Sequence, residues 1–135
     1  MHLSARADYA LRAAIELAVT PDRPATAEHL ARAQEIPDQY LPAILTQLRR
    51  SNIVRSKRGP DGGFWLARPA GQISLADVIR AMDGQLLGVR GERPENLSYR
   101  GAAEPLQRVW IALRAAERAV LERVTLEDVV SGDVP

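Results

Sequence analysis

The segment from residue 53 to residue 68, IVRSKRGPDGGFWLAR, restricts the fold more than any other part of the chain. Its two short runs, IVRSKR and FWLAR, have the residue types of strands, and the turn GPDGG supplies the positive φ angles that a tight hairpin needs. A phosphate-binding enzyme loop would also be rich in glycine. Such a loop leads from a strand into a helix and carries Lys before Ser or Thr. Here a strand-like run follows and no such pair occurs, so the segment predicts a β-hairpin.

Helical patterns precede the hairpin. An amphipathic stretch from Ser4 to about Thr20 predicts a first helix, and Thr26 is placed to cap a second, short one. A third helix is predicted from Pro37 to Asn52, because proline suits a first helical turn and asparagine tolerates the left-handed conformation that ends a helix. Its apolar residues recur at i, i+3, i+4 and i+7 and form one buried stripe, Leu41, Ile44, Leu45 and Leu48.

Helical patterns also follow the hairpin. Two capping pairs, Ser74 with Asp77 and Thr125 with Asp128, predict the starts of two more helices. A long amphipathic helix is predicted between them, over residues 104–123, after an irregular, glycine-rich loop. The order of three helices, a hairpin and a further helix is that of a winged helix-turn-helix protein.

The stretch from Gln39 to Pro60 contains five cationic side chains and no acidic one, although the net charge of the chain is only +1. These cations are Arg49, Arg50, Arg55, Lys57 and Arg58. Because ordinary solvated faces interleave both signs, the stretch is a candidate surface for a polyanion. In a winged helix, the third helix enters the major groove of DNA and the basic wing lies along the backbone or in the minor groove. Element order and charge together favour double-stranded DNA as the partner.

Other classes of protein find little support. The sequence contains no cysteine, which excludes disulfides, thiol catalysis and cysteine-ligated metal sites. His2 and His29 are too few and too far apart to suggest a metal site, and no nucleophile motif occurs, so no catalytic residue is assigned. No apolar run approaches the ~18 residues of a membrane helix, and the N-terminus lacks the plan of a signal peptide. We therefore expect a cytoplasmic protein that is neither an enzyme nor membrane-bound.

Three motifs carry a resemblance to a known family: the helix YLPAIL, the wing RGPDGG and the helix SLADVI. In their context, IPDQYLPAILTQLRRSNIVRSKRGPDGGFWLARP followed by ISLADVIRAMDG, they resemble the family of the iron–sulfur cluster regulator IscR and the nitrite-sensing repressor NsrR, often called the Rrf-two family. The similarity is close over residues 2–84 and looser over residues 104–130. It implies a dimeric bacterial transcription factor.

The resemblance also implies which residues contact DNA. Asp38, Gln39 and Tyr40 lie at the exposed start of the recognition helix, and Arg58 of the wing reaches the minor groove. Pro42 lacks the polar group with which some members contact a base. With the first-helix positions where members touch phosphate and with the wing glycines, the expected DNA-binding set is Ser4, Arg6, Tyr9, Asp38, Gln39, Tyr40, Arg49, Arg50, Lys57, Arg58, Gly59, Gly62 and Gly63.

The loop before the long helix distinguishes this chain from well-known members of the family. They bind an iron–sulfur cluster through three cysteines there, whereas QLLGVRGERPENLSYRGAA, residues 85–103, has none. We therefore expect no cluster and no other metal. A small anionic effector is one alternative, because guanidinium groups match carboxylate or phosphate, and a constitutive regulator is the other. The candidate effector residues are Arg90, Arg93, Tyr99 and Arg100.

The expected fold class is mostly α with a small β-hairpin, a winged helix-turn-helix domain plus a long C-terminal dimerisation helix. Residues 1–84 are expected to form the DNA-binding domain, residues 85–103 a loop, and residues 104–135 the dimerisation helix and a short last helix. The residues expected at the dimer interface are Leu106, Val109, Trp110, Leu113, Val120 and Leu121. The expected function is that of a sequence-specific regulator, a repressor that binds a palindromic operator as a homodimer. The alternative is a protein–protein interaction module that uses the long helix and keeps residual DNA affinity.

Overall fold

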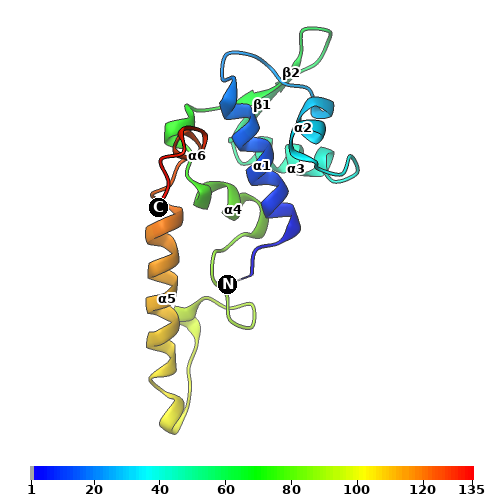
Figure 1. Ribbon diagram of the computed structural model, residues 1–135. Coiled ribbons are helices and arrows are strands. Elements are labelled where there is room, and N and C mark those ends of the chain that lie inside the picture. The colour runs from blue at the N-terminus through cyan, green and yellow to red at the C-terminus, as the bar shows by residue number, and fades with distance from the viewer. Residues whose placement is uncertain (1) are drawn as a thin grey trace.

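The computed structural model describes residues 2–135, and its elements follow the order expected from the sequence (Figure 1). They are α1 (Ala5–Val19), α2 (Ala27–Gln34), α3 (Leu41–Arg50), β1 (Val54–Lys57), β2 (Gly63–Leu66), η1 (Ala70–Gln72), α4 (Leu75–Asp83), η2 (Pro94–Asn96), η3 (Gly101–Ala103), α5 (Leu106–Leu121) and α6 (Leu126–Ser131). The two strands pair as one antiparallel hairpin. A mostly helical fold with a small β-hairpin is therefore confirmed.

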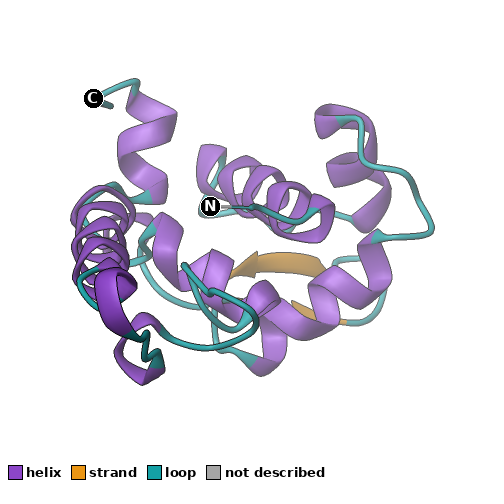
Figure 2. Ribbon diagram, turned by 90° about the horizontal axis from the view of Figure 1, so that it is seen from below, coloured by secondary structure: helices purple, strands orange, loops and turns teal. Residues whose placement is uncertain are grey.

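α1 is the central helix, and it contacts α2, α3, α4, α6 and β2. Much of its inward surface is alanine, and Ala7, Ala10, Ala13 and Ala14 are fully buried. Such small side chains let neighbouring elements pack closely on several sides of one helix. Figure 2 shows α1 passing over the hairpin, with the other helices around it. α1 thus holds α3 and the hairpin in one fixed arrangement.

The main part of the core is an apolar cluster that joins the N-terminal helices to the end of the chain. Its largest fully buried side chains are Leu30, Leu41, Ile44, Leu48, Ile53, Ile73, Val78 and Leu126. Leu126 belongs to α6, which returns to the winged domain after α5. Two backbone hydrogen bonds hold it there, from the Leu126 amide to the Ile73 carbonyl (3.0 Å) and from the Leu75 amide to the Val124 carbonyl (3.0 Å). The last helix therefore completes the core of the winged domain.

The predicted helix boundaries are mostly confirmed, because they rest on local capping chemistry. Ser74 with Asp77 and Thr125 with Asp128 form complete capping boxes at the starts of α4 and α6. Thr26 caps α2 by accepting a hydrogen bond from the His29 amide. Asn52 has the left-handed conformation (φ 58°) that ends the third helix.

The start of the recognition helix differs from the prediction. The sequence predicted a helix from Pro37, but residues 38–40 form a turn, closed by a hydrogen bond from the Tyr40 amide to the Pro37 carbonyl, and α3 begins at Leu41. The reason is Pro42. A helix starting at Pro37 would place this second proline in its interior, where the ring clashes with the carbonyl of residue 38 and no amide can donate. With the helix starting at Leu41, Pro42 lies in the first turn, where proline is tolerated.

The hairpin directs one face toward α3 and the other away from it. Val54 pairs with Leu66, and Ser56 pairs with Phe64, on the face that packs toward the core. This confirms that one of the two adjacent aromatic residues faces inward, and it is Phe64. The hairpin is also attached to the segment before α2, because Ala25 and Phe64 exchange two backbone hydrogen bonds of 2.9 and 2.8 Å.

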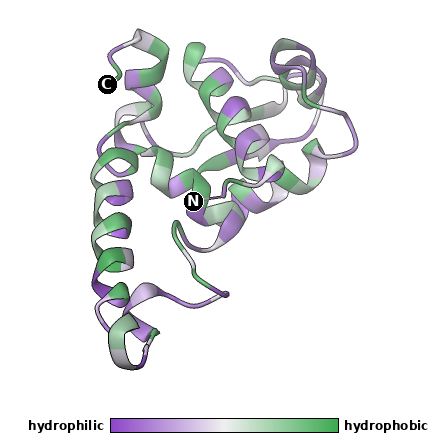
Figure 3. Cartoon of the chain, turned by 60° about the horizontal axis from the view of Figure 1, so that its bottom comes forward, coloured by the Kyte–Doolittle hydropathy of each residue, from purple (hydrophilic) through white to green (hydrophobic). Residues whose placement is uncertain are grey.

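α5 extends from the body of the molecule, on the side opposite α2 and α3 (Figure 1). In the part of the chain that the structure describes, this long helix contains no buried residue. Hydrophobic residues nevertheless occur along its whole length (Figure 3). Within residues 2–135, no helix is long and apolar enough to cross a membrane.

Candidate nucleic-acid interface

A groove of about 380 Å³ separates the exposed side of α3 from the hairpin. α3 contributes Pro42, Thr46 and Arg49 to its lining, and the hairpin contributes Lys57 and Arg58. The other lining residues are mostly apolar: Ala27, Leu45, Ser56 and Phe64. A groove with cations and apolar groups side by side suits a sugar-phosphate strand, because its phosphates are anionic and its sugar rings present C–H groups.

Within residues 2–135, the cations near this groove form no ion pair with an acidic side chain. Across residues 2–135, arginine side chains elsewhere form ion pairs, namely Arg12, Arg80, Arg114 and Arg118. No ion pair of the described chain involves a cation of the segment 49–58. Arg49 donates a hydrogen bond to the Ser56 hydroxyl (3.4 Å), which links the end of α3 to the hairpin. The predicted polyanion surface thus presents exposed cations that form no ion pair within residues 2–135.

Strand alternation places one of the five cations elsewhere. Arg55 pairs with Trp65 across the ladder, on the face opposite Ser56 and Phe64. Arg55 therefore points away from α3, whereas Arg49 and Arg58 line the groove. Lys57 lies on the Arg55 side of the ladder, at the edge of the hairpin, and it lines both the groove and a second hollow beside Trp65. Arg50 is exposed at the end of α3.

The wing glycines have structural roles that do not depend on a ligand. A Cβ atom on Gly62 would lie 2.1 Å from the Lys57 carbonyl oxygen, and one on Gly63 would lie 2.8 Å from the Ala25 carbonyl oxygen. Gly63 also has a φ of +143°. Gly59, with a φ of +107°, lies in open space at the exposed tip. Of the three wing glycines, Gly59 is therefore the one with open space beside its Cα atom, while its carbonyl accepts a hydrogen bond from the Gly62 amide (2.9 Å).

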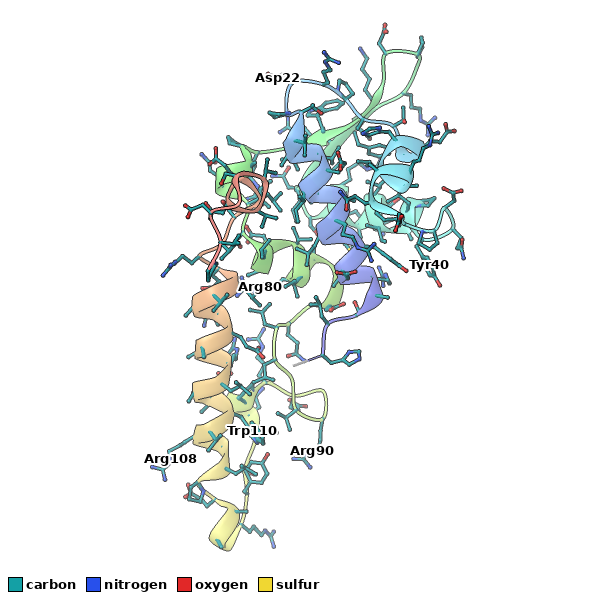
Figure 4. All side chains as sticks on the ribbon, in the orientation of Figure 1. Asp22, Tyr40, Arg80, Arg90, Arg108 and Trp110 are labelled. Carbon is teal, nitrogen blue, oxygen red and sulfur yellow. The ribbon has the colours of Figure 1, made fainter. Side chains whose placement is uncertain are left out.

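The first helix meets the recognition helix through two tyrosines. The rings of Tyr9 and Tyr40 lie 5.6 Å apart, and the Arg12 guanidinium lies 4.8 Å from the Tyr9 ring centre. Tyr40 projects to the surface from the turn before α3 (Figure 4). The turn residues Asp38 and Gln39 are also exposed. The first helix and the start of the recognition helix thus form one continuous surface.

Two more predicted residues lie near the start of α1. Ser4 caps the helix, since its hydroxyl accepts a hydrogen bond from the Ala7 amide at 3.0 Å. The same hydroxyl donates to Asp83 at the end of α4 (2.6 Å), so it is engaged within the protein. Arg6 is exposed, and no ion pair of the described residues includes it.

The predicted dimer residues divide between two faces of α5. Leu106, Val109, Leu113 and Val120 are exposed. Trp110 and Leu121 instead face the protein's own body. The Trp110 indole donates a hydrogen bond to the Tyr99 hydroxyl (3.1 Å), and Leu121 packs against the small cluster of Ala76, Ile79 and Leu86. The sequence stripe therefore contains an exposed face and an adjoining anchoring face.

A charged contact also fixes α5 to α4. Arg80 of α4 and Arg118 of α5 both donate to the Glu122 carboxylate, the latter at 3.0 Å. The hydrogen bond from Arg80, then that from Arg118, lowers the pKa of Glu122 below its ordinary value of 4.5. Arg80 belongs to the last turn of α4, and Figure 4 labels it below that helix.

The loop over residues 85–103 is irregular, as expected, yet it is anchored. Leu86, Leu87, Pro94 and Leu97 are buried within it. The three candidate effector arginines are exposed, and Arg90 occupies the tip of a tight turn that points into solvent (Figure 4). Tyr99, the fourth candidate, is held by Trp110.

Sequence reasoning noted two residues of the interface without assigning them a role. Ala43 is exposed, and Thr46 lines the groove. A spacing signal was present, because these residues lie four and seven positions after Gln39, on the side of the helix opposite the buried leucines. Their small side chains carry neither a charge nor an amide, so composition and charge do not distinguish them.

Comparison with known proteins settles the family. The chain matches the Rrf2 family, described as an iron-dependent transcriptional regulator, over residues 3–132. The chain belongs to the Rrf2 family. This confirms the resemblance inferred from its motifs.

Individual relatives agree with the Rrf2 assignment. An HTH-type transcriptional regulator of Mycobacterium tuberculosis, Rv1287, is 48% identical over 136 residues, which span 100% of this chain and 84% of the relative. The structure of CymR, the global cysteine regulator of B. subtilis, superposes with a TM-score of 0.80 at 29% identity and covers 97% of each chain. IscR of T. potens gives a TM-score of 0.79 at 25% identity, over 98% of this chain and 88% of that one. The protein is therefore a transcriptional regulator that binds DNA, and not an enzyme.

The iron in the Rrf2 family description requires ligands from the protein chain. The sequence contains no cysteine and only two histidines. Among residues 2–135, no three His, Asp or Glu side chains lie together in a way that could hold a metal ion. The donor set of this Rrf2 protein therefore does not fit an iron–sulfur cluster.

Proposed function

We propose that this Rrf2 protein is a cytoplasmic repressor that binds a palindromic operator as a homodimer, without an iron–sulfur cluster. The observation that carries the proposal is the groove between α3 and the hairpin, whose cations Arg49, Lys57 and Arg58 form no ion pair with any described acidic residue. Occupancy of an operator would exclude the transcription machinery from the same DNA.

α3 and the wing have different tasks in this proposal. α3 enters the major groove, where the Gln39 amide can pair with N6 and N7 of adenine. The wing follows the backbone into the minor groove, where Arg58 meets a strongly negative potential. Arg49, Arg50 and Lys57 bind phosphates and so position the protein without selecting a sequence.

A second copy of the chain is the occupant that we propose for the exposed face of α5. The apolar residues Leu106, Val109, Leu113, Ala116 and Val120 recur at alternating intervals of three and four along it, and all are exposed. This spacing is that of a coiled-coil seam, and a two-fold axis would bring the same face of both copies together. Such a dimer can present two recognition helices about one DNA turn apart, ~34 Å.

Regulation would act on the loop over residues 85–103, which lies between the DNA-binding domain and α5. A small anion held by Arg90, Arg93 or Arg100 changes operator affinity only if it binds two arrangements of the dimer unequally. The alternative is a constitutive repressor whose operator occupancy follows its own concentration. A thermal shift on addition of cytoplasmic small-molecule extract, together with a change in operator affinity, distinguishes the two.

The proposal is tested by equilibrium binding to a selected operator at increasing salt. We expect a steep, linear fall of log affinity with log salt, because each phosphate contact releases about 0.9 counterion. Arg58→Ala should weaken binding by about 1–3 kcal/mol and reduce the slope by about one. The matched control is Arg108→Ala, an exposed arginine on α5 at the far side of the molecule (Figure 4). Equal affinity and slope for Arg58→Ala and wild type would contradict the wing assignment, and binding that is insensitive to salt would favour the interaction-module alternative.

A further inference from the structure

The outward stripe of α3 lacks polar groups at its centre. Ala43, Thr46 and Arg50 succeed one another at intervals of three and four residues, opposite the buried stripe of the helix, and Gln39 precedes them in the turn before α3. Ala43 and the neighbouring Pro42 are exposed, and Thr46 is half-buried. Between the amide at one end and the guanidinium at the other, this stripe presents methyl groups, a proline ring and one hydroxyl.

The nearest polar side chains are directed elsewhere. The Gln47 amide donates to the Ala81 carbonyl at 3.2 Å, which ties α3 to α4. The Arg49 guanidinium donates to Ser56 in the hairpin and lines the groove on that side. Neither is therefore placed on the outward stripe that would meet base edges.

Each base presents a different set of chemical groups in the major groove, and these sets indicate which base the outward stripe of α3 fits. Guanine is recognised by the paired donors of Arg or Lys, and cytosine by a carboxylate acceptor, and the centre of the stripe has neither. Thymine is the base that presents a methyl group in the major groove, and small apolar side chains and the threonine methyl contact it. We propose that Ala43 and Thr46, with Pro42 beside them, select A·T pairs at the centre of each half-site by contacting thymine methyl groups. This inference rests on the proposed function and names the base pairs that its recognition helix selects.

The groove beside α3 supports this placement. Pro42 and Thr46 belong both to the methyl-bearing surface and to the groove lining, where Arg49 and Lys57 supply positive charge. A DNA strand held there by its phosphates would border the same major groove into which the stripe projects. Phosphate contacts then fix the depth of the helix, so that side chains as short as alanine reach the bases.

Deoxyuridine provides the test, because it differs from thymidine only by the missing methyl group and pairs with adenine in the same way. An operator is first selected from random duplex DNA with the wild-type protein, and each thymidine of a half-site is then replaced in turn. We expect one or two central replacements to weaken binding about fourfold each, because each removes a methyl group whose burial contributes about as much as one CH₂ group. Thr46→Ser, which deletes only a methyl group, should lose the sensitivity at one of these positions. The matched control is Thr20→Ser, at an exposed site at the end of α1.

Each outcome bears on the inference. Selection of central A·T pairs, with deoxyuridine sensitivity that Thr46→Ser abolishes and Thr20→Ser retains, supports it. Central G·C pairs, or full affinity for deoxyuridine at every position, overturns it and leaves the proposed function standing. Failure to enrich any duplex sequence overturns the proposed function and this inference with it.

Discussion

Leu113→Glu should separate the proposed dimer into folded monomers. Leu113 is 40% exposed in the single chain, in the middle of the apolar seam on α5. Complete burial of a leucine side chain contributes about 1.5–3 kcal/mol, so covering the exposed part of Leu113 in a dimer contributes about 1 kcal/mol to association. A symmetric dimer contains the residue twice, and truncation to alanine should therefore raise the dimer dissociation constant about 30-fold. Glutamate adds the desolvation of two carboxylates, several kcal/mol each, which should leave monomer at micromolar concentration.

Sedimentation velocity measures the association state, and circular dichroism verifies that α5 remains helical. The matched control is Ile111→Glu. Ile111 is 37% exposed on the same helix, but two residues from Leu113, about 200° around the axis. It should leave the dimer intact. A dimer that survives Leu113→Glu, or one that Ile111→Glu disrupts equally, would refute the assignment of this face to a second copy.

Three further results are expected. Gln39→Ala should relax sequence preference more than it lowers nonspecific affinity, measured on operator and scrambled duplexes, and a uniform loss would show that Gln39 only positions the backbone. The pKa of Glu122 is lowered in the folded protein, so the contact with Arg80 stabilises the folded state fully above the ordinary carboxyl pKa, and this stabilisation is lost as the pH falls through the folded pKa. Between about pH 5 and pH 3, the melting temperature of the wild type should therefore fall more steeply than that of Glu122→Gln. Parallel curves for the two proteins would argue against this contact. Protein produced with added iron should be colourless and bind operator without iron, whereas a visible charge-transfer band would contradict the cluster-free proposal.

Local signals in the sequence predicted most of the secondary structure. The capping pair of Ser74 with Asp77 and the left-handed Asn52 act over a few residues, and both are present. The start of α3 was misplaced because two prolines competed for the first helical turn. Both Pro37 and Pro42 suit that turn by residue type, but only Pro42 occupies it in the structure.

The candidate interface was predictable as charge, but its geometry was not. The cations of residues 49–58 stand together in the sequence, and the absence of acids among them was sufficient to select them. The direction of Arg55, away from α3, depends on which face of the hairpin meets the core. Phe64 packs inward, and this places Arg55 on the outer face. Likewise, the sequence alone does not divide the apolar stripe of α5 into anchoring and exposed residues. That division depends on the hydrogen bond from Trp110 to Tyr99 of the loop before α5.

Directed cleavage of DNA tests the central claim most directly, that α3 lies in the major groove of a palindromic operator. Because the 135 residues contain no cysteine, Ala43→Cys provides a single attachment point for an iron-chelate cleavage reagent on the exposed side of α3. We predict two clusters of cuts, one in each half-site, with major-groove character and about one helical turn apart. The same reagent on Ile111→Cys, on α5, should cut little. Absent or scattered cuts from position 43, or stronger cuts from position 111, would contradict the account.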